Sequence, residues 1–314
     1  MALRLSIIVV AFDMKREIVR TIASLLPPYQ LAVTNGDVEI IVVDNNSAEP
    51  VRRDWFPADG PVRVVRVEDG GVSPCIAINR GARLARADHL AVLIDGARLA
   101  SPGLLSTALA ASRVHPRSFV ATLSFHIGHK KQQVSLTEGY TREVEDGLLN
   151  SIGWPEDGYR LFEICTLGEG RDAAAHGVLK MRAETNFCFM RTSDFMEMGG
   201  FNERFIQLGG GFANFDFFRR AAEAAREGFV MLVGEGTFHQ VHCGVTTQAG
   251  GVDRKYDGNL SLWDLYGREY EHIVGQAFTL TAQTPALFGR VTHSEVPRLF
   301  FGKYSKNEEL CSRV

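Results

Sequence analysis

The sequence predicts an α/β fold built on a mostly parallel sheet, because short β-branched runs alternate with longer segments of helical spacing. The short runs are continuously apolar, which is typical of parallel strands covered by helices on both faces. In such sheets ligands bind outside the carboxyl ends of the strands. The residues that follow each strand are therefore the first candidates for function.

The elements can be placed in order along the chain. Apolar runs rich in Val, Ile and Leu predict strands at 5–12, 38–43, 62–67, 89–94 and 119–125. Apolar residues at helical spacing predict helices at 14–26, 72–87 and 102–114. Later in the chain, the same criteria predict a strand near 229–233 and a helix near 260–274.

Composition describes a soluble globular chain of 314 residues, with 45% hydrophobic and 23% charged residues. The formal net charge of -3 gives no general attraction to nucleic acid or to an anionic membrane. The apolar run at 5–12 is too short to span a membrane and lacks a cleavage site. The five cysteines form no CxxC pair, so we expect a reducing cytoplasm and neither disulfides nor a cysteine zinc site.

Residues at the strand ends carry the chemistry. The first strand ends in "VVAFDMK" without a glycine, which excludes both a dinucleotide-binding turn and a phosphate loop. Asp44 ends the second strand in "EIIVVDNNSAEP", where a carboxylate either accepts hydrogen bonds from a base or ribose edge or caps the next helix. Asn79 and Gly81 lie in the helix ahead of the strand that delivers Asp95.

Taken together, "LSIIVVAFDMKREIVRTIASL", "EIIVVDNNS", "NRGARLARADHLAVLIDGARLASPG" and "MRTSDFMEMGGFNERF" with "GGGFANFDFFRRA" resemble the GT-A fold glycosyltransferases of family 2 over residues 4–245. The resemblance implies a Rossmann-like sandwich that moves a sugar from a UDP- or GDP-linked donor to a hydroxyl of a saccharide or small-molecule acceptor. It also implies a nucleotide-sugar site lined by Ala11, Phe12, Asp13, Asp44, Asn79, Gly81 and Asp95.

The sequence departs from the family at the metal motif. Asp95 matches the first acid of the Asp-x-Asp motif, but Gly96 is followed by Ala97 where the second acid should stand. Because a methyl group cannot bind Mg²⁺ or Mn²⁺, the divalent cation would need Asp95 with His242 and His239 from "GEGTFHQVHCG", which the resemblance offers as ligands. Alternatively, Arg98 binds the diphosphate, unless it is an exposed strand-end arginine. The pair His126 and His129 is interpreted as solvated surface.

A second departure concerns the general base. The acidic pair expected in "GGGFANFDFFRRA" is replaced by Ala213 and Asn214, which leaves Asp216 as a possible substitute. Without a base, retention of the anomeric configuration is the simplest chemistry, with the leaving diphosphate accepting the proton. Glu184 and Glu203 flank the expected sugar and acceptor pocket, and Gly210 and Gly211 belong to the glycine run beside it.

Three regions are expected: 1–125 for the nucleotide sugar, 126–245 for the acceptor with a flexible insertion at about 126–182, and 246–314 as a loop, helix and arm. In the last region Lys255 and Tyr256 could reach phosphate, and the arm could make contacts in a homo-oligomer. Two other functions stay open. A nucleotidyltransferase would need a basic glycine-rich loop after the first strand, whereas a catalytically silent nucleotide-sugar binder would fit the missing acids.

Overall fold

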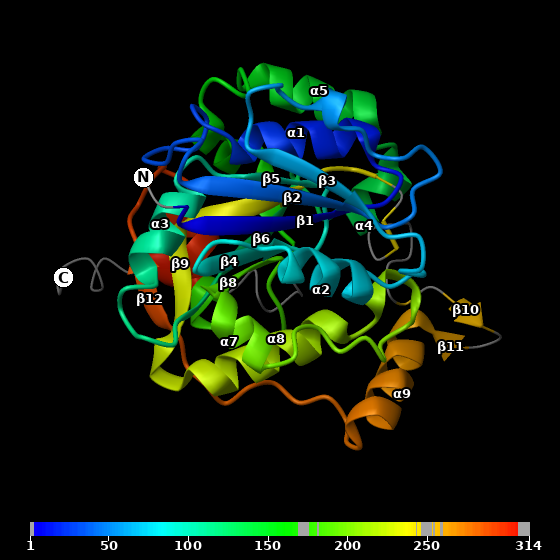
Figure 1. Cartoon of the computed structure of the whole chain (residues 1–314). Helices are drawn as coiled ribbons and strands as arrows, with labels where there is room; N and C mark the ends of the chain where they lie inside the picture. Colours follow the sequence, from blue (N-terminus) through cyan, green and yellow to red (C-terminus); the bar gives the residue numbers. More distant parts are fainter. Residues whose placement is uncertain are drawn as a thin grey trace.

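A computed structural model describes residues 3–168, 176–180, 182–242, 244–245, 253, 255–257 and 260–306. At its centre lies a ten-stranded sheet of order β12-β9-β6-β8-β4-β1-β2-β3, with β5 paired to β9 and β7 paired to β6 (Figure 1). The strands of this sheet are β1 Leu5–Ala11, β2 Val38–Asp44, β3 Val62–Arg66, β4 His89–Leu93, β5 Arg98–Ala100, β6 Phe119–Ile127, β7 Cys165–Leu167, β8 Phe187–Arg191, β9 Phe229–His239 and β12 Ala286–Gly289. A separate pair consists of β10 Lys255–Asp257 and β11 Leu260–Ser261.

The strand directions bring several chain segments to one edge of the sheet. β3, β2, β1 and β4 are parallel, and β6, β9 and β12 are also parallel to one another. β8 lies between β4 and β6 and is antiparallel to both. The carboxyl ends of β1, β2, β4, β6 and β9 therefore share an edge with the amino end of β8. This arrangement confirms the predicted mostly parallel α/β sheet.

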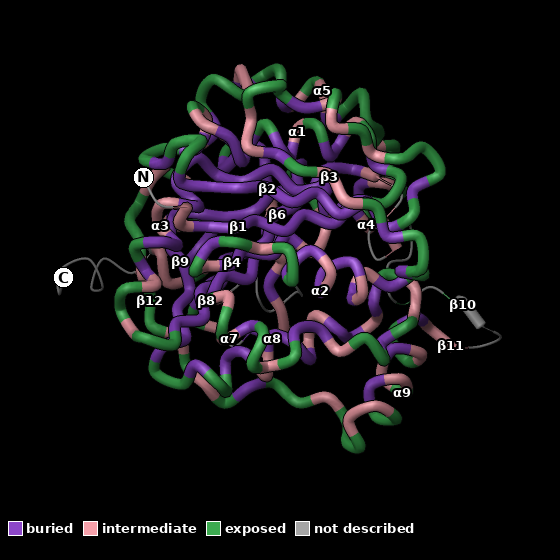
Figure 2. The backbone as a smooth tube through the Cα atoms, viewed as in Figure 1, coloured by how far each residue is buried: buried purple, intermediate pink, exposed green. Residues whose placement is uncertain are grey.

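Helices cover both faces of the sheet. The helices of the described residues are α1 Lys15–Leu25, α2 Cys75–Arg83, α3 Leu104–Ala111, α4 Gln132–Ser135, α5 Arg142–Ser151, α7 Thr192–Glu197, α8 Ala213–Ala225, α9 Leu262–Val274 and α10 Val296–Phe301, of which α9 lies to one side of the sheet. In Figure 1, α1 and α5 lie above the sheet, whereas α2, α7 and α8 lie below it. Alternate residues of β1 point to opposite faces of the sheet. Val9 belongs to the hydrophobic cluster that includes α1, and Ile8 belongs to the cluster that includes α2. Figure 2 shows the central strands β1, β2, β4 and β6 as a buried layer between these helices.

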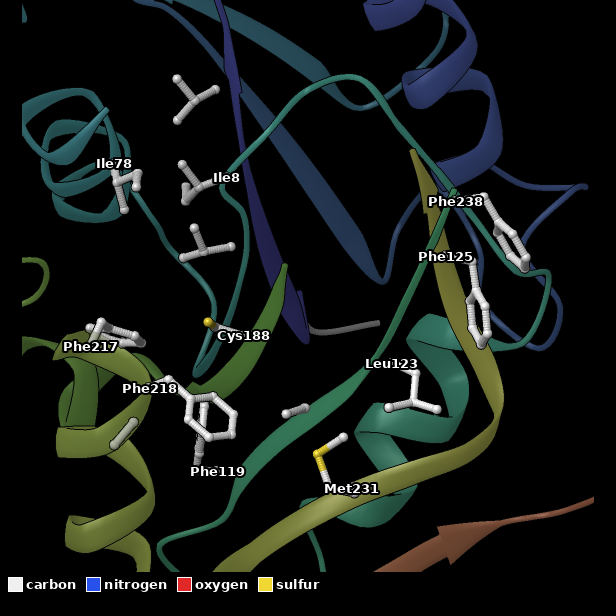
Figure 3. Packing of buried hydrophobic residues seen from close by; sticks show 14 of the residues in the cluster. Ile8, Ile78, Phe119, Leu123, Phe125, Cys188, Phe217, Phe218, Met231 and Phe238 are labelled. Carbon is white, nitrogen blue, oxygen red and sulfur yellow. The ribbon is translucent and has the colours of Figure 1, made fainter. Parts of the chain in front are cut away.

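Aromatic side chains fix α8 against the sheet. Phe119 of β6 makes an edge contact with Phe218 of α8 at 5.6 Å between ring centroids, and it stacks on Phe229 of β9 at the same separation. Figure 3 shows Phe217 and Phe218 beside Phe119, with Phe125 next to Phe238 further along the same pair of strands. Each fully buried ring contributes about 2 kcal/mol or more of hydrophobic free energy. This packing holds the start of α8 near the edge where the strand ends meet.

Two predicted boundaries do not match the fold. The boundary between 125 and 126 falls inside β6, which continues to Ile127, so the first two predicted regions share one sheet. Beyond 246, β12 pairs with β9, and α10 buries Val296, Leu299 and Phe300 in the core. The described C-terminal residues are thus part of the body of the fold rather than an arm. Their short, largely exposed strand carries no periodic pattern by which the sequence could have predicted it.

Within the described residues, no helix combines the length and apolar character needed to cross a membrane.

Candidate active site

Asp95, His239 and His242 converge at the carboxyl edge of the sheet. Asp95 follows β4, His239 ends β9, and His242 lies three residues beyond. The Asp95 Oδ2 lies 2.9 Å from His239 Nε2 and 3.6 Å from His242 Nε2, and the two Nε2 atoms are 3.1 Å apart. One ligand atom from each residue fits within 4.8 Å of the others. The arrangement places three metal-ligating groups close enough to share one ion.

Electrostatics keep Asp95 and His239 in forms that can bind a cation, whereas they favour the protonated form of His242. Burial by itself would raise the pKa of the Asp95 carboxyl, but His242 and His239 outweigh it and hold that pKa well below its usual range. Burial lowers the pKa of His239 to about 4, although Asp95 opposes this shift. At His242 burial also acts downward, but the Asp95 carboxylate outweighs it and raises the pKa. His239 is therefore a neutral imidazole at neutral pH, which is the form that binds metals.

Gln132 orients the ring of His239. The His239 Nδ1 lies 2.5 Å from the Gln132 Oε1, and the Gln132 Nε2 donates to the His239 carbonyl at 3.0 Å. The backbone N–H of Gln132 donates to His126 Nδ1 at 2.9 Å. Because its Nδ1 side is held in this way, His239 presents Nε2 to Asp95. No sequence pattern pointed to Gln132, because it belongs to a helix of only four residues.

His126 corrects a prediction made from the sequence. It is only 5% exposed, and its ring lies 5.6 Å from that of His239, so it does not lie on a solvated surface. The physical reason is that β6 continues past Phe125 and pairs His126 with His239 of β9. Burial, with the nearby charges of His239 and Arg98, holds the pKa of His126 well below its usual value.

Arg98 is buried rather than exposed, contrary to the alternative considered from the sequence. It is 7% exposed, and its Nε lies 3.7 Å from the Asp95 Oδ2. Within the described part of the chain, its Nε and Nη1 have no hydrogen-bond partner. Burial lowers the pKa of this guanidinium, while Asp95 and Glu184 oppose the shift. A buried guanidinium with unused donors is poised to bind an anion.

The position of the missing second acid faces the core. Ala97 is fully buried and packs in the same core cluster as α1. Its backbone N–H donates to the Asp95 Oδ1 at 3.0 Å, and its carbonyl accepts from the N–H of Gln240 at 2.8 Å. Gly96 has no room for a side chain, since a Cβ would lie 2.4 Å from the Val10 carbonyl oxygen. Gly96 and Ala97 thus shape the turn that presents Asp95.

The predicted nucleotide residues divide into exposed and internal groups. Phe12 is 50% exposed, whereas Ala11 is buried. The carboxylate of Asp13 accepts from the N–H of Ala48 at 2.7 Å. Asp44 is fully buried, and its oxygens accept from the N–H of Ser47 at 2.9 Å and from Arg66 Nη1 at 2.7 Å. Asp44 thus organises the loop that follows β2, and its contact with a ligand stays a prediction.

Asn79 and Gly81 also make internal contacts. Asn79 accepts from the N–H of Phe201 at 2.9 Å and donates to its carbonyl at 2.8 Å, which joins α2 to the segment after α7. Asn79 also donates to Glu203 Oε1 at 2.9 Å. A Cβ on Gly81 would lie 2.7 Å from the Ile8 Cγ2, so this glycine allows α2 to approach β1.

The segment in which a general base was expected contains an unpredicted hydrogen bond between Asn214 and Glu184. Ala213 is buried in the core, and Asp216 is ion-paired with Arg220 at 2.7 Å. The Asn214 Nδ2 donates to the Glu184 Oε2 at 2.6 Å, although thirty residues separate them. Gly210 and Gly211 precede α8 with φ of 86° and 53°, which favour glycine. These turns set the direction in which α8 begins.

Lys255 lies on β10 and is exposed, with Tyr256 beside it on the same strand. Their predicted contact with phosphate stays a prediction, and the neighbouring Arg254 lies outside the described residues.

Glu145 is a site neighbour that sequence reasoning missed. Its Oε2 accepts from the N–H of Val241 at 2.6 Å, one residue before His242, and its Oε1 contacts Arg16 Nη1 at 3.2 Å. Burial raises its pKa to about 7, against the opposing effects of Val241 and Arg16. Glu145 therefore fastens α5, within the predicted insertion, both to α1 and to the segment that carries His242.

The fold and this site define an α/β protein with three side chains of metal-ligating type and a buried arginine at the carboxyl edge of its sheet. The family model described as glycosyl transferase family 2 matches residues 6–167, and the chain belongs to this family. Family membership and the sheet together confirm the GT-A type of fold predicted from the sequence.

Similar solved structures are distant. One is S. aureus TarS 1-349, with 13% identity and a TM-score of 0.46 over 76% of this chain and 59% of that chain. Another is the mannosyltransferase PcManGT from Pyrobaculum calidifontis in complex with GDP-Man and Mn²⁺, with 14% identity and a TM-score of 0.46 over 77% of this chain and 58% of that chain. The chain thus spans less than two thirds of the length of these structures. No curated protein matches it.

Proposed function

We propose that this chain is a glycosyltransferase that moves a hexosyl group from a UDP- or GDP-linked donor to a hydroxyl of a saccharide or small-molecule acceptor. Family membership supports this function, and the observation that carries it is the convergence of Asp95, His239 and His242 beside Arg98. A diphosphate needs positive charge, and these four residues lie where nucleotides bind in open α/β sheets. Exposed Phe12 at the end of β1 offers a face on which a base can stack.

A divalent cation fits the donor set. Two imidazole nitrogens and one carboxylate suit Mn²⁺, and Mg²⁺ would rely more on the Asp95 oxygen and on oxygens of the diphosphate. When bound, such an ion would neutralise charge on the leaving diphosphate. Gln132, which orients His239, would set the direction of one ligand.

Arg98 supplies protein-borne charge at the same place. Its Nε, which lies 3.7 Å from the Asp95 Oδ2, and its Nη1 have no hydrogen bond within the described residues, so a diphosphate oxygen there would satisfy buried donors. We therefore propose that Arg98 acts together with the cation rather than in place of it. The anomeric outcome depends on whether a side-chain carboxylate takes the proton of the acceptor. If none does, retention is expected, with the proton passing to the diphosphate.

The acceptor would enter near Glu203, Gly210 and Gly211, next to the start of α8. Lys255 and Tyr256 would approach the donor phosphates. A cytoplasmic location and a homo-oligomeric state remain part of the proposal, and gel filtration with light scattering measures the latter.

Calorimetry with UDP and GDP, each with and without Mn²⁺, tests the proposal. One nucleotide should bind more tightly with the ion, and a hundredfold excess over its Kd should stabilise the fold by about 2.7 kcal/mol. Asp95→Ala and His242→Ala should lose the Mn²⁺ effect, whereas the control His129→Ala, an exposed histidine, should keep it. Arg98→Met should bind nucleotide more weakly in either condition. Absence of binding by both nucleotides would refute the proposal.

A catalytically silent nucleotide-sugar binder is the second candidate. It is favoured by the two departures from the family, Ala97 in the core and Asn214 in place of an acid. Release of free sugar from a nucleotide sugar separates the two functions, because a silent binder would hold the donor without turnover.

A further inference from the structure

We infer that Glu145 is a positioning residue for the cation site: through the N–H of Val241 it fixes the segment that carries His242, so that α5 sets the affinity for a divalent ion. This inference rests on the proposed function, because it concerns the ion that would assist the leaving diphosphate. It gives α5 a role at the donor, although the sequence assigned this part of the chain to a flexible insertion on the acceptor side.

The three ligand groups already have the spacing that one ion requires. Two ligand atoms at right angles on an octahedral ion, with bonds of about 2.1 Å, lie about 3 Å apart. Asp95 Oδ2 lies 2.9 Å from His239 Nε2 and 3.6 Å from His242 Nε2, and the two Nε2 atoms are 3.1 Å apart. A functional constellation tolerates displacements of only about 0.5 Å. The affinity for the ion therefore depends on what holds His242 in place.

His242 lies three residues beyond the end of β9 at His239, so its position depends on contacts outside the sheet. Gln240 is the first residue after the strand, and it is tied on two sides. Its backbone N–H donates to the Ala97 carbonyl at 2.8 Å, and its side-chain Nε2 donates to the Glu17 carbonyl of α1 at 3.1 Å. The chain is thus held as far as residue 240.

Glu145 holds the next residue of this segment. Its Oε2 accepts from the N–H of Val241 at 2.6 Å, and its Oε1 lies 3.2 Å from both Nη1 and Nη2 of Arg16. Arg16 Nη2 also donates to the carbonyl of Arg142, at the start of α5, at 3.2 Å. Figure 1 shows α5 lying over α1, as these contacts require. The segment after β9 is therefore fastened to both helices.

The bond to Val241 is the contact that reaches His242. The side chain of Glu145 is fully buried and Val241 is 6% exposed, so their bond lies where the local dielectric is low and such bonds are strong. Without the carboxylate, the Val241 N–H would be buried without its acceptor, which is costly. The segment would relieve this cost by moving toward water or another acceptor, and His242, as the adjacent residue, would move with it.

Calorimetry with Mn²⁺ alone at pH 8 tests the inference. Glu145→Ala should weaken Mn²⁺ binding about 10- to 100-fold, as loss of a partner that orients a metal ligand does. Glu145→Gln keeps an oxygen for the Val241 N–H and should restore most of the affinity. The matched control Glu143→Ala, an exposed glutamate on the same helix, should bind Mn²⁺ like the wild type.

Two further measurements separate positioning from a general loss of structure. The Kd for UDP or GDP in EDTA should be the same in all these variants, because Arg98 is left in place. Gln240→Met removes the donor to the Glu17 carbonyl while leaving Glu145 intact, and it should weaken Mn²⁺ binding as well. This variant tests the same segment if Glu145→Ala does not fold, which urea unfolding would show.

Wild-type Mn²⁺ affinity in a folded Glu145→Ala protein would overturn the inference and leave Glu145 as a residue that only joins α5 to α1. Equal losses in Glu145→Ala and Glu145→Gln would also overturn it, because the charge beside Arg16 would then matter rather than the bond to Val241. If the wild type binds nucleotide but no Mn²⁺, the inference fails while the proposed function survives with Arg98. If it binds Mn²⁺ but neither nucleotide, the proposed function fails, and the Mn²⁺ affinities still decide the role of Glu145.

Discussion

Glu145 makes the stability of this protein depend on pH in a direction that is unusual for a carboxylate. Its side chain is fully buried, and its pKa rises from 4.5 to about 7. The folded protein therefore holds a proton that the unfolded chain releases at a lower pH. Since stability falls with rising pH wherever the native state binds more protons, the contribution of Glu145 declines between about pH 4.5 and 7. Above that window it stays constant.

The size of the effect follows from the shift. One pKa unit corresponds to about 1.4 kcal/mol, so the shift at Glu145 corresponds to about 3 kcal/mol. Glu145→Gln keeps an oxygen for the N–H of Val241 but cannot titrate. The difference in unfolding free energy, wild type minus Glu145→Gln, should therefore fall by about 3 kcal/mol between pH 4 and pH 8. Groups that titrate in both proteins cancel in this difference.

Urea unfolding followed by circular dichroism at pH 4, 5, 6, 7 and 8 measures this difference, with the m-value checked for two-state behaviour. Glu143→Gln is the matched control on the same helix. Its carboxyl is exposed and has a lowered pKa, so its difference should not decline with rising pH. A difference for Glu145→Gln that is flat or rises with pH would refute the reasoning, because it would mean that the buried carboxyl is ionised throughout.

Three further predictions concern packing, loop order and metal binding. Gly81→Ala should destabilise the fold by about 1 to 3 kcal/mol, whereas Gly147→Ala, in open space on α5, should stabilise it by about 0.5 to 1 kcal/mol, as urea unfolding would measure. Asp44→Ala should lower the free energy of unfolding by about 3 kcal/mol or more, because the N–H of Ser47 and the guanidinium of Arg66 would lose their acceptor. Thermal unfolding without ligand would show this. Gln132→Leu should weaken Mn²⁺ binding about 10- to 100-fold by releasing the ring of His239, and unchanged Kd in calorimetry would contradict this.

Much of the fold could be predicted because its strands are continuously apolar. β1, β2 and β4 begin and end within about one residue of their predicted bounds, and Asp95, His239 and His242 were expected to lie at one edge. These three residues do converge, because the carboxyl ends of β4 and β9 lie at the same edge of the sheet.

What escaped prediction depends on contacts between distant segments. Whether Asp44 faces a ligand or its own loop depends on Arg66, which arrives from the neighbouring strand. The pairing of Glu184 with Asn214 joins residues thirty positions apart and has no periodic signature. Burial of Arg98 follows from its pairing opposite His239 on β9, which no local pattern encodes.

The departure at Ala97 is best explained by the side on which this residue lies. Ala97 points into the core cluster of α1, while the next residue, Arg98, lies in the charged cluster with Asp95. We expect Ala97→Asp to destabilise the protein by several kcal/mol, since it would bury a carboxylate without a partner. We expect no gain in Mn²⁺ affinity, because a carboxylate at 97 would face away from His239 and His242. Urea unfolding and calorimetry measure the two quantities on the same variant. A stable Ala97→Asp protein that binds Mn²⁺ more tightly would show that the segment can rotate to present position 97. In that case the Asp-x-Asp geometry would be latent in this chain rather than replaced by the histidines after β9.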